Sequence, residues 1–210
     1  LNKLYCKFAI AVDLRKSHIQ LLVESSLYEQ AVEQYRQLTQ LEPANIDHLK
    51  QWGILIMRQS SLPEDKRGQQ ALAVWRKIIE KSPEDAVTVS QVADLCLQHK
   101  LFEPAESYYR QAVKLAPDDV QYREYLGEFL HRQKRVDEAL VVWSEITSGN
   151  RETSSNLSRV AEIYNNFGFT EKANSSIARA AELSSKDFQL QVLAAKMHNR
   201  ANLPAQALTF

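Results

Sequence analysis

The stretch Val136-Asp-Glu-Ala-Leu-Val-Val-Trp143 has counterparts at Phe102-Glu-Pro-Ala-Glu-Ser-Tyr-Tyr109 and at Gly68-Gln-Gln-Ala-Leu-Ala-Val-Trp75. In each stretch an alanine stands four residues before a bulky aromatic side chain. The alanine occurs six times, with a first gap of 40 residues and then gaps of 34 residues, at Ala31, Ala71, Ala105, Ala139, Ala173 and Ala207. A fixed period of this length predicts an array of stacked supersecondary units.

Three further positions repeat with the alanine. The bulky residue four places later is Tyr35, Trp75, Tyr109, Trp143 or Ile177. A small residue precedes the alanine at Gly53, Ala93, Gly127, Ala161 and Ala195, and a proline follows it at Pro43, Pro83 and Pro117. Such offsets place side chains along one helical stripe, where small residues let paired helices approach and the aromatic fills the groove between them. Proline ends the second helix because it lacks an N–H group.

The pattern resembles the tetratricopeptide repeat, a helix–turn–helix unit, in its 34-residue period, its alanine, the aromatic residue four places later and the closing proline. The resemblance covers nearly the whole chain and implies an all-α fold, a right-handed superhelical α-solenoid of antiparallel helix pairs. Residues 1–11 are predicted to be an N-terminal helical extension or the remnant of a preceding repeat. The predicted array fills residues 12–210, with repeats at about 12–45, 46–85, 86–119, 120–153 and 154–187 and a partial repeat at 188–210.

Four features depart from this pattern. Ile19 stands where a small residue is usual, and Arg151 and Ser185 replace the closing proline. Gly149 can end the fourth unit's second helix instead, because glycine readily adopts a left-handed conformation. The extra residues of the second unit, near 59–68, are predicted to form a surface loop. The incomplete sixth unit is predicted to expose an apolar edge that another copy or the rest of a longer protein covers.

Composition narrows the possible functions. Lys plus Arg and Asp plus Glu number 26 each, so the net charge is zero and nucleic-acid binding is not expected. No apolar run approaches the ~20 residues that span a bilayer, so direct membrane insertion is not expected either. Cys6 and Cys96 are predicted to be small buried hydrophobes. The cellular compartment stays open, with the cytoplasm favoured.

No motif for catalysis or for a cofactor appears. The sequence has no His-Glu-x-x-His pair, no glycine-rich phosphate loop and no Gly-x-Ser-x-Gly elbow. The chain is therefore predicted not to be an enzyme and to need no cofactor or metal. Two histidines are predicted to pack in the core, His18 and His198, and the three tryptophans are assigned to the core as well. The remaining histidines, His48, His99 and His131, are predicted to be solvated.

The resemblance implies a concave surface that the first helices of successive units line and in which a partner peptide lies. In the first unit the inward residues include Lys16, Gln20 and Glu24. The predicted partner-binding residues of the later units are Lys50, Gln51, Arg58, Gln91, Asp94, Glu124, Tyr125, Glu128, Arg132, Arg159, Glu162 and Asn166.

Acidic side chains dominate the centre of this predicted surface. Asp94, Glu124, Glu128 and Glu162 are expected to gather around Tyr125, against Arg132 and Arg159. The hypothesis is that the surface accepts an extended or helical segment with at least one basic residue, which Tyr125 anchors.

The predicted function is a non-catalytic protein–protein interaction scaffold that binds a partner peptide or protein segment in the concave groove. One alternative is a structural segment for self-assembly or docking, with self-association through the exposed terminal repeat. Another is a regulatory arm of a larger multidomain protein, which could be an enzyme.

Overall fold

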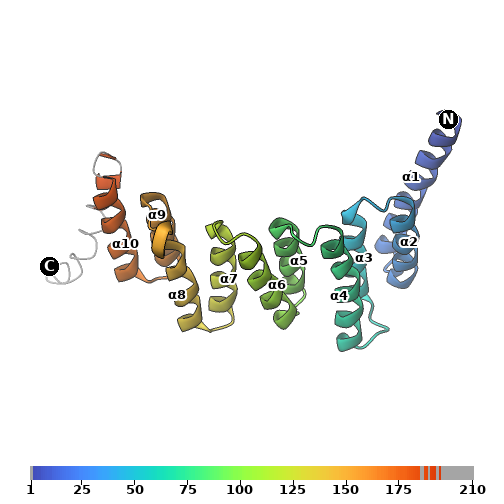
Figure 1. The fold of residues 1–210 in the computed structure, drawn as a ribbon. Coiled ribbons are helices and arrows are strands. Elements are labelled where there is room, and N and C mark those ends of the chain that lie inside the picture. The colour runs from blue at the N-terminus through green and yellow to red at the C-terminus, as the bar shows by residue number, and fades with distance from the viewer. Residues whose placement is uncertain (1, 185–186, 189, 193, 195–210) are drawn as a thin grey trace, which may run out of the picture. The chain divides into compact units, whose positions relative to one another are not determined.

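The computed structural model describes residues 2–184, 187–188, 190–192 and 194, and the regular structure among these residues is entirely helical (Figure 1). This confirms the all-α prediction. The elements are α1 (Asn2–Glu24), α2 (Tyr28–Leu41), α3 (Ile46–Arg58), α4 (Glu64–Lys81), α5 (Ala86–Gln98), α6 (Phe102–Leu115), α7 (Val120–Arg132), α8 (Val136–Ser144), η1 (Glu145–Thr147), η2 (Gly149–Arg151), α9 (Ser154–Asn166) and α10 (Thr170–Leu183).

The chain divides into two compact units, residues 1–115 and 116–210. In the first unit, α1 packs on α2, α3 on α4 and α5 on α6, and each pair also contacts the next along the chain. In the second unit, α7 packs on α8 and α9 on α10. The predicted solenoid of helix pairs is present in both units. The exact repeat boundaries and the assignment of residues 1–11 stay predictions, although α1 runs without a break from Asn2 to Glu24.

The repeated alanines form the centre of each helix pair. The five that lie in the described helices are all fully buried: Ala31, Ala71, Ala105, Ala139 and Ala173. Two helix pairs also bring a glycine of the first helix into close contact with a tryptophan of the second. A Cβ added to Gly53 would lie 2.1 Å from Nε1 of Trp75, and a Cβ on Gly127 would lie 2.1 Å from Nε1 of Trp143. Glycine is thus required at both positions for the helices to pack this closely.

The first helices of the later pairs begin at polar capping residues. The side chains of Asn45, Asp85, Asp119 and Thr153 each accept a hydrogen bond from a backbone N–H in the first turn of the helix that follows. Such caps satisfy donors that the helix itself leaves free.

The second helix of the fourth unit stops early. It ends at Ser144 and is followed by two 3₁₀ turns, the second of which begins at Gly149 with a φ of 61°. The predicted helix end at Gly149 is therefore wrong, because α8 ends five residues earlier, with Glu145 as its C-cap, and Gly149 adopts its left-handed conformation only in the second 3₁₀ turn.

The insertion in the second unit is a loop only in its first half. Residues 59–63 connect the helices, but α4 begins at Glu64 and is 18 residues long, against 14 for α2. The prediction of a loop across residues 59–68 is therefore wrong for its second half. Glu64 and Asp65 favour an early start because acidic side chains stabilise the positive N-terminus of a helix.

Four histidine predictions and one tryptophan prediction are corrected. His18 is exposed, His48 is buried, and His99 and His131 are half-buried against aromatic rings, whereas Trp75 and Trp143 are fully buried as expected. Trp52 is only half-buried. His198 and nearly all of the predicted sixth repeat lie outside the described residues.

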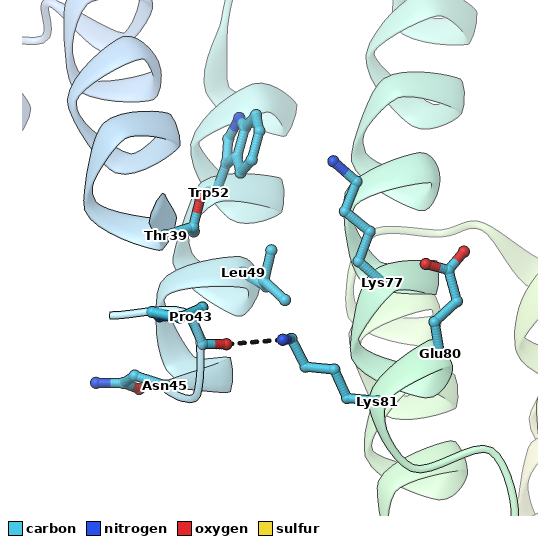
Figure 2. Close-up of a pocket in the computed structure, with 8 residues that line it drawn as sticks. All are labelled: Thr39, Pro43, Asn45, Leu49, Trp52, Lys77, Glu80 and Lys81. Carbon is cyan, nitrogen blue, oxygen red and sulfur yellow. Dashed lines mark hydrogen bonds between the residues drawn. The ribbon is translucent and has the colours of Figure 1, made fainter. Parts of the chain in front are cut away.

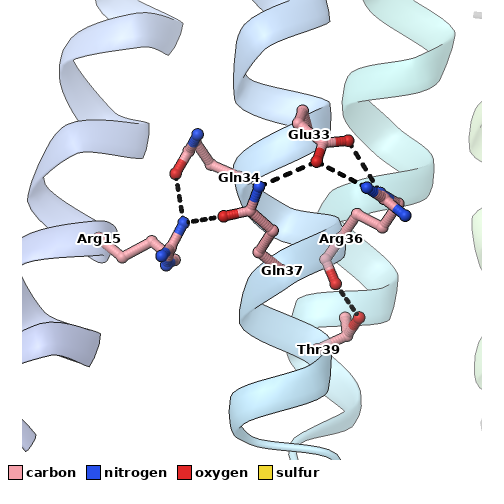
Figure 3. Close-up of polar contacts among 6 residues, drawn as sticks. All are labelled: Arg15, Glu33, Gln34, Arg36, Gln37 and Thr39. Atoms are coloured by element: carbon pink, nitrogen blue, oxygen red, sulfur yellow. Dashed lines mark hydrogen bonds and ion pairs between the residues drawn. The ribbon is translucent and has the colours of Figure 1, made fainter. Parts of the chain in front are cut away.

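A polar network fixes α1 against α2 on the outside of the first helix pair (Figure 3). Nη1 of Arg15 donates hydrogen bonds to Oε1 of Gln34 and to Oε1 of Gln37, both at 2.5 Å. Gln37 in turn donates to Glu33 at 2.9 Å, and Arg36 holds the same carboxylate and lowers the pKa of Glu33 to about 2. These contacts set the position of α1, which lines the groove described next.

No helix among the described residues is both long enough and apolar enough to cross a membrane. Cys96 is buried as predicted, and burial raises the pKa of its thiol to about 12.

Candidate protein-interaction surface

A groove of about 460 Å³ lies between α1 and α3 in the first unit. Its floor is apolar and its rim is polar. The lining residues are Lys16, Ile19, Gln20, Val23 and Glu24 of α1, Tyr35 of α2, and Gln51, Ile54, Leu55 and Arg58 of α3. The structure therefore brings two of the predicted binding residues, Gln51 and Arg58, together with three that were assigned to the inward face of the first unit.

The apolar floor was not predicted, although the sequence contained its signal. Ile19 occupies the position that Gly53 and Gly127 hold in later units, and it is almost fully buried. An isoleucine there takes up space that the aromatic residue otherwise fills. Tyr35 packs against the buried cluster of Val12, Ile19 and Leu38. It is itself only half-buried and lines the groove. Burial also raises the pKa of the Tyr35 hydroxyl.

A chain of charged groups holds the helices around one end of the groove. Nζ of Lys16 lies 3.2 Å from Oε2 of Glu42, at the C-terminus of α2, and Nε2 of the buried His48 lies 2.6 Å from the same oxygen. The hydrogen bond with His48, followed by that with Lys16, lowers the pKa of Glu42. Residues of α1, α2 and α3 are thus connected through one carboxylate.

A second group of predicted residues meets across α3 and α5. Nζ of Lys50 donates to Oε1 of Gln91 at 3.2 Å and lies 3.4 Å from Oδ1 of Asp47. Asp94, one turn further along α5, accepts a hydrogen bond from the hydroxyl of Tyr109 at 2.5 Å. Asp94 is therefore already paired within its own helix pair.

In the second unit, the predicted residues of α7 and α9 form ion pairs with one another. Nε of Arg159 donates to Oε2 of Glu124 at 2.8 Å, and Nη1 of the same arginine lies 3.8 Å from Glu162. Arg132 lies 3.5 Å from Glu128. Each of these three glutamates has an arginine within ion-pair distance, so the negative charge expected here is largely offset.

The surroundings of Glu128 differ from those of the other two glutamates. Burial raises the pKa of Glu128, against the opposing effect of Arg132. Next to it, the half-buried Tyr125 accepts a hydrogen bond from Nε2 of Gln121. Asn166 is exposed at the C-terminus of α9 and lies outside this group of ion pairs. The second unit therefore offers a mixed-charge surface with one aromatic ring.

These arrangements provide what recognition of a peptide requires, namely apolar contact area, hydrogen-bonding side chains and charges. Among the residues that the structure describes, no group of three or more His, Cys, Asp or Glu side chains could hold a metal ion. None of the predicted binding residues forms a nucleophile–base pair in the contacts given above.

Comparison with known proteins agrees with the repeated packing. Residues 93–143 match a family model described as tetratricopeptide repeat, and this range holds the small residue, alanine and aromatic positions of α5 to α8. No curated protein shows a significant sequence match.

Several solved structures are similar to the chain. TTC0263, a thermophilic TPR protein in Thermus thermophilus, is 18% identical, with 90% of this chain and 99% of that chain covered and a TM-score of 0.44. YrrB, a TPR protein with an unusual peptide-binding site, is 18% identical, with 90% and 97% covered and a TM-score of 0.42. MamA is 14% identical, with 81% and 96% covered and a TM-score of 0.44.

The assignment depends on the matched residues and on the buried alanines that recur in both units, rather than on these distant structural likenesses. Residues 93–143 match the tetratricopeptide-repeat family, and the helix pairs on either side of this segment repeat the same buried alanine.

Proposed function

We propose that this chain is a non-catalytic scaffold that binds a segment of a partner protein on the exposed face of its first helices. Tetratricopeptide-repeat proteins generally bind protein or peptide partners, and they are generally not catalytic. The observation that carries the proposal is the groove between α1 and α3, which has an apolar floor and a polar rim.

The chemistry of this groove suits a short extended segment. Its volume of about 460 Å³ accommodates one or two apolar side chains of a partner against Ile54 and Tyr35. Gln20 and Gln51 on the rim can both donate to and accept from a peptide backbone. Arg58 adds a fixed positive charge, so an acceptor group of the partner is favoured beside it.

The residues of α7 and α9 form the second part of the proposed surface. Here a basic residue of the partner would compete with Arg159 for Glu124, or with Arg132 for Glu128, while Tyr125 provides an aromatic contact. Each exchanged ion pair is worth only about 0.2–1 kcal/mol, so several contacts must act together to give specificity.

The test begins with selection of peptides from a displayed random library on the intact chain, followed by calorimetric titration of the enriched peptides. Ile54→Asp and Arg58→Glu place a charge on the floor and reverse one on the rim, and each is expected to weaken binding at least tenfold. Arg76→Glu, an exposed substitution on α4, is the matched control and should leave the affinity unchanged. Equal affinity in all three variants would contradict a role for the groove.

One observation favours the alternative of a segment for self-assembly. Leu14 and Leu21 lie seven residues apart on α1, on one face of the helix, and their side chains are 65% and 62% exposed. A second copy docking on this face would give a mass that rises with concentration in light scattering, and Leu14→Glu would abolish the rise. The terminal repeat that was predicted to mediate self-association lies almost entirely outside the described residues, and the regulatory-arm alternative remains a proposal.

A further inference from the structure

A second pocket, of about 330 Å³, lies on another side of α3 (Figure 2). Leu49 and Trp52 of α3 form its apolar wall, and the other lining residues are Thr39, Pro43, Asn45, Lys77, Glu80 and Lys81. At 100° per residue, Leu49 and Trp52 fall roughly opposite Ile54 and Arg58 on α3. The pocket is therefore separate from the groove between α1 and α3.

The charged residues of the pocket are on α4, and Lys77 and Lys81 extend from it toward α3 (Figure 2). Nζ of Lys77 lies 5.2 Å from the ring centroid of Trp52, and Nζ of Lys81 donates to the backbone carbonyl of Pro43 at 2.7 Å. Neither lysine pairs with a carboxylate among the described residues. With Glu80 as the one acidic lining residue, the pocket carries an excess of positive charge.

Trp52 also presents a donor without an acceptor. Its Nε1 is buried and has no hydrogen-bond partner among the described residues. The same atom of Trp75 and of Trp143 donates to a backbone carbonyl, at 3.2 and 3.4 Å. A buried donor of this kind is costly because it has lost its hydrogen bond to water without gaining one in the fold.

We propose that this pocket binds an acidic segment of a partner protein, in which an apolar side chain is next to an aspartate or glutamate. The apolar side chain packs on Leu49 and on the ring of Trp52. The carboxylate lies between the ammonium groups of Lys77 and Lys81, whose charge it complements. A basic segment is disfavoured because its positive charge would be repelled by Lys77 and Lys81. The site is independent of the groove, so either can fail without the other.

The test uses the indole N–H signals of the intact ¹⁵N-labelled chain, which has three tryptophans. Trp52→Phe identifies the Trp52 signal. The probe is the blocked peptide acetyl-Glu-Leu-Asp-Leu-Glu-amide, and the control peptide replaces each acidic residue with lysine. The Trp52 signal is expected to shift in a saturable manner with the acidic peptide and to stay in place with the basic one.

Two substitutions separate the pocket from its surroundings. The double variant Lys77→Ala/Lys81→Ala is expected to weaken binding of the acidic peptide about fivefold, because two exposed charge pairs are lost. Arg76→Ala removes a neighbouring positive charge on α4 that does not line the pocket, and it should leave the affinity unchanged. Circular dichroism of all variants confirms that the helices are intact.

Three results would overturn the proposal. The first is an unchanged Trp52 signal at saturating acidic peptide. The second is an equal response to the basic peptide. The third is an equal response to inorganic phosphate at the same concentration, which would indicate a general anion site and not a peptide site. None of these results bears on Arg58 or on the groove between α1 and α3.

Discussion

Nε1 of Trp75 donates a hydrogen bond to the backbone carbonyl of Lys50 at 3.2 Å, from the second helix of a pair to the first. The second unit repeats this contact between Trp143 and Glu124 at 3.4 Å. Lys50 and Glu124 also carry candidate binding side chains, which contact Gln91 and Arg159. The packing that defines the repeat therefore also holds the backbone beneath the proposed binding surface.

Gly53→Ala is expected to lower the free energy of unfolding by about 1–3 kcal/mol, because the added methyl group overlaps the fully buried indole of Trp75. Urea denaturation followed by circular dichroism measures the change. Helix propensity alone would make the same substitution stabilising by about 1 kcal/mol. A more stable variant would therefore contradict the close packing, and Gln70→Ala, exposed on α4, controls for propensity effects.

Glu42→Gln is expected to reduce the loss of stability in acid. The pKa of Glu42 is held below its ordinary value of 4.5 by its hydrogen bonds to His48 and Lys16. Its contribution is therefore present above that ordinary value and is lost as the pH falls through the lowered pKa. Urea unfolding between about pH 6 and pH 3 should show that the free energy of unfolding falls less steeply with decreasing pH for the variant than for the unsubstituted chain. If the free energies of the two proteins fall in parallel, Glu42 does not contribute.

Substitutions of Glu124 and Arg159 are expected to have non-additive effects on the free energy of unfolding, because the two side chains form an ion pair. Arg159 is half exposed, but the Glu124 side chain is only 14% exposed, so the pair is partly shielded from solvent. Glu124→Gln and Arg159→Gln, with the double variant, form a cycle whose coupling free energy should be about 0.5–1 kcal/mol. The coupling should shrink in high salt; a coupling of zero in dilute buffer would mean that the pair does not form in solution.

The thiol of Cys96 is expected to resist modification in the folded protein. Burial raises its pKa to about 12, so almost none of it is thiolate at neutral pH. In a Cys6→Ser background, a thiol-reactive disulfide reagent should modify Cys96 only as fast as the protein unfolds, and 6 M guanidinium chloride should expose it at once. Rapid modification under native conditions would show that α5 opens locally.

The sequence predicted the parts of the fold that depend on local spacing. The buried alanines and the glycine–tryptophan contacts both follow from offsets within one helix pair. The early start of α4 did not follow, because an insertion has no counterpart elsewhere in the array with which it can be compared.

Contacts between pairs were harder to predict. His48 was assigned to solvent, yet it is buried because Glu42 of the preceding helix pair reaches its ring. The departure at Ile19 was visible in the sequence, but its effect on Tyr35, and hence the shape of the groove, depends on packing in three dimensions. The pairing of Glu124 with Arg159 likewise joins two helices, whereas Arg132 pairs with Glu128 four residues away within α7.

The most direct test of the central proposal is amide chemical-shift mapping of the intact chain with a library-selected peptide. We expect the largest shifts at Gln20 of α1 and at Gln51, Ile54 and Arg58 of α3, which line the groove. Arg76 on the exposed side of α4 should not move. Saturable binding with its shifts confined to residues outside the groove would contradict the account.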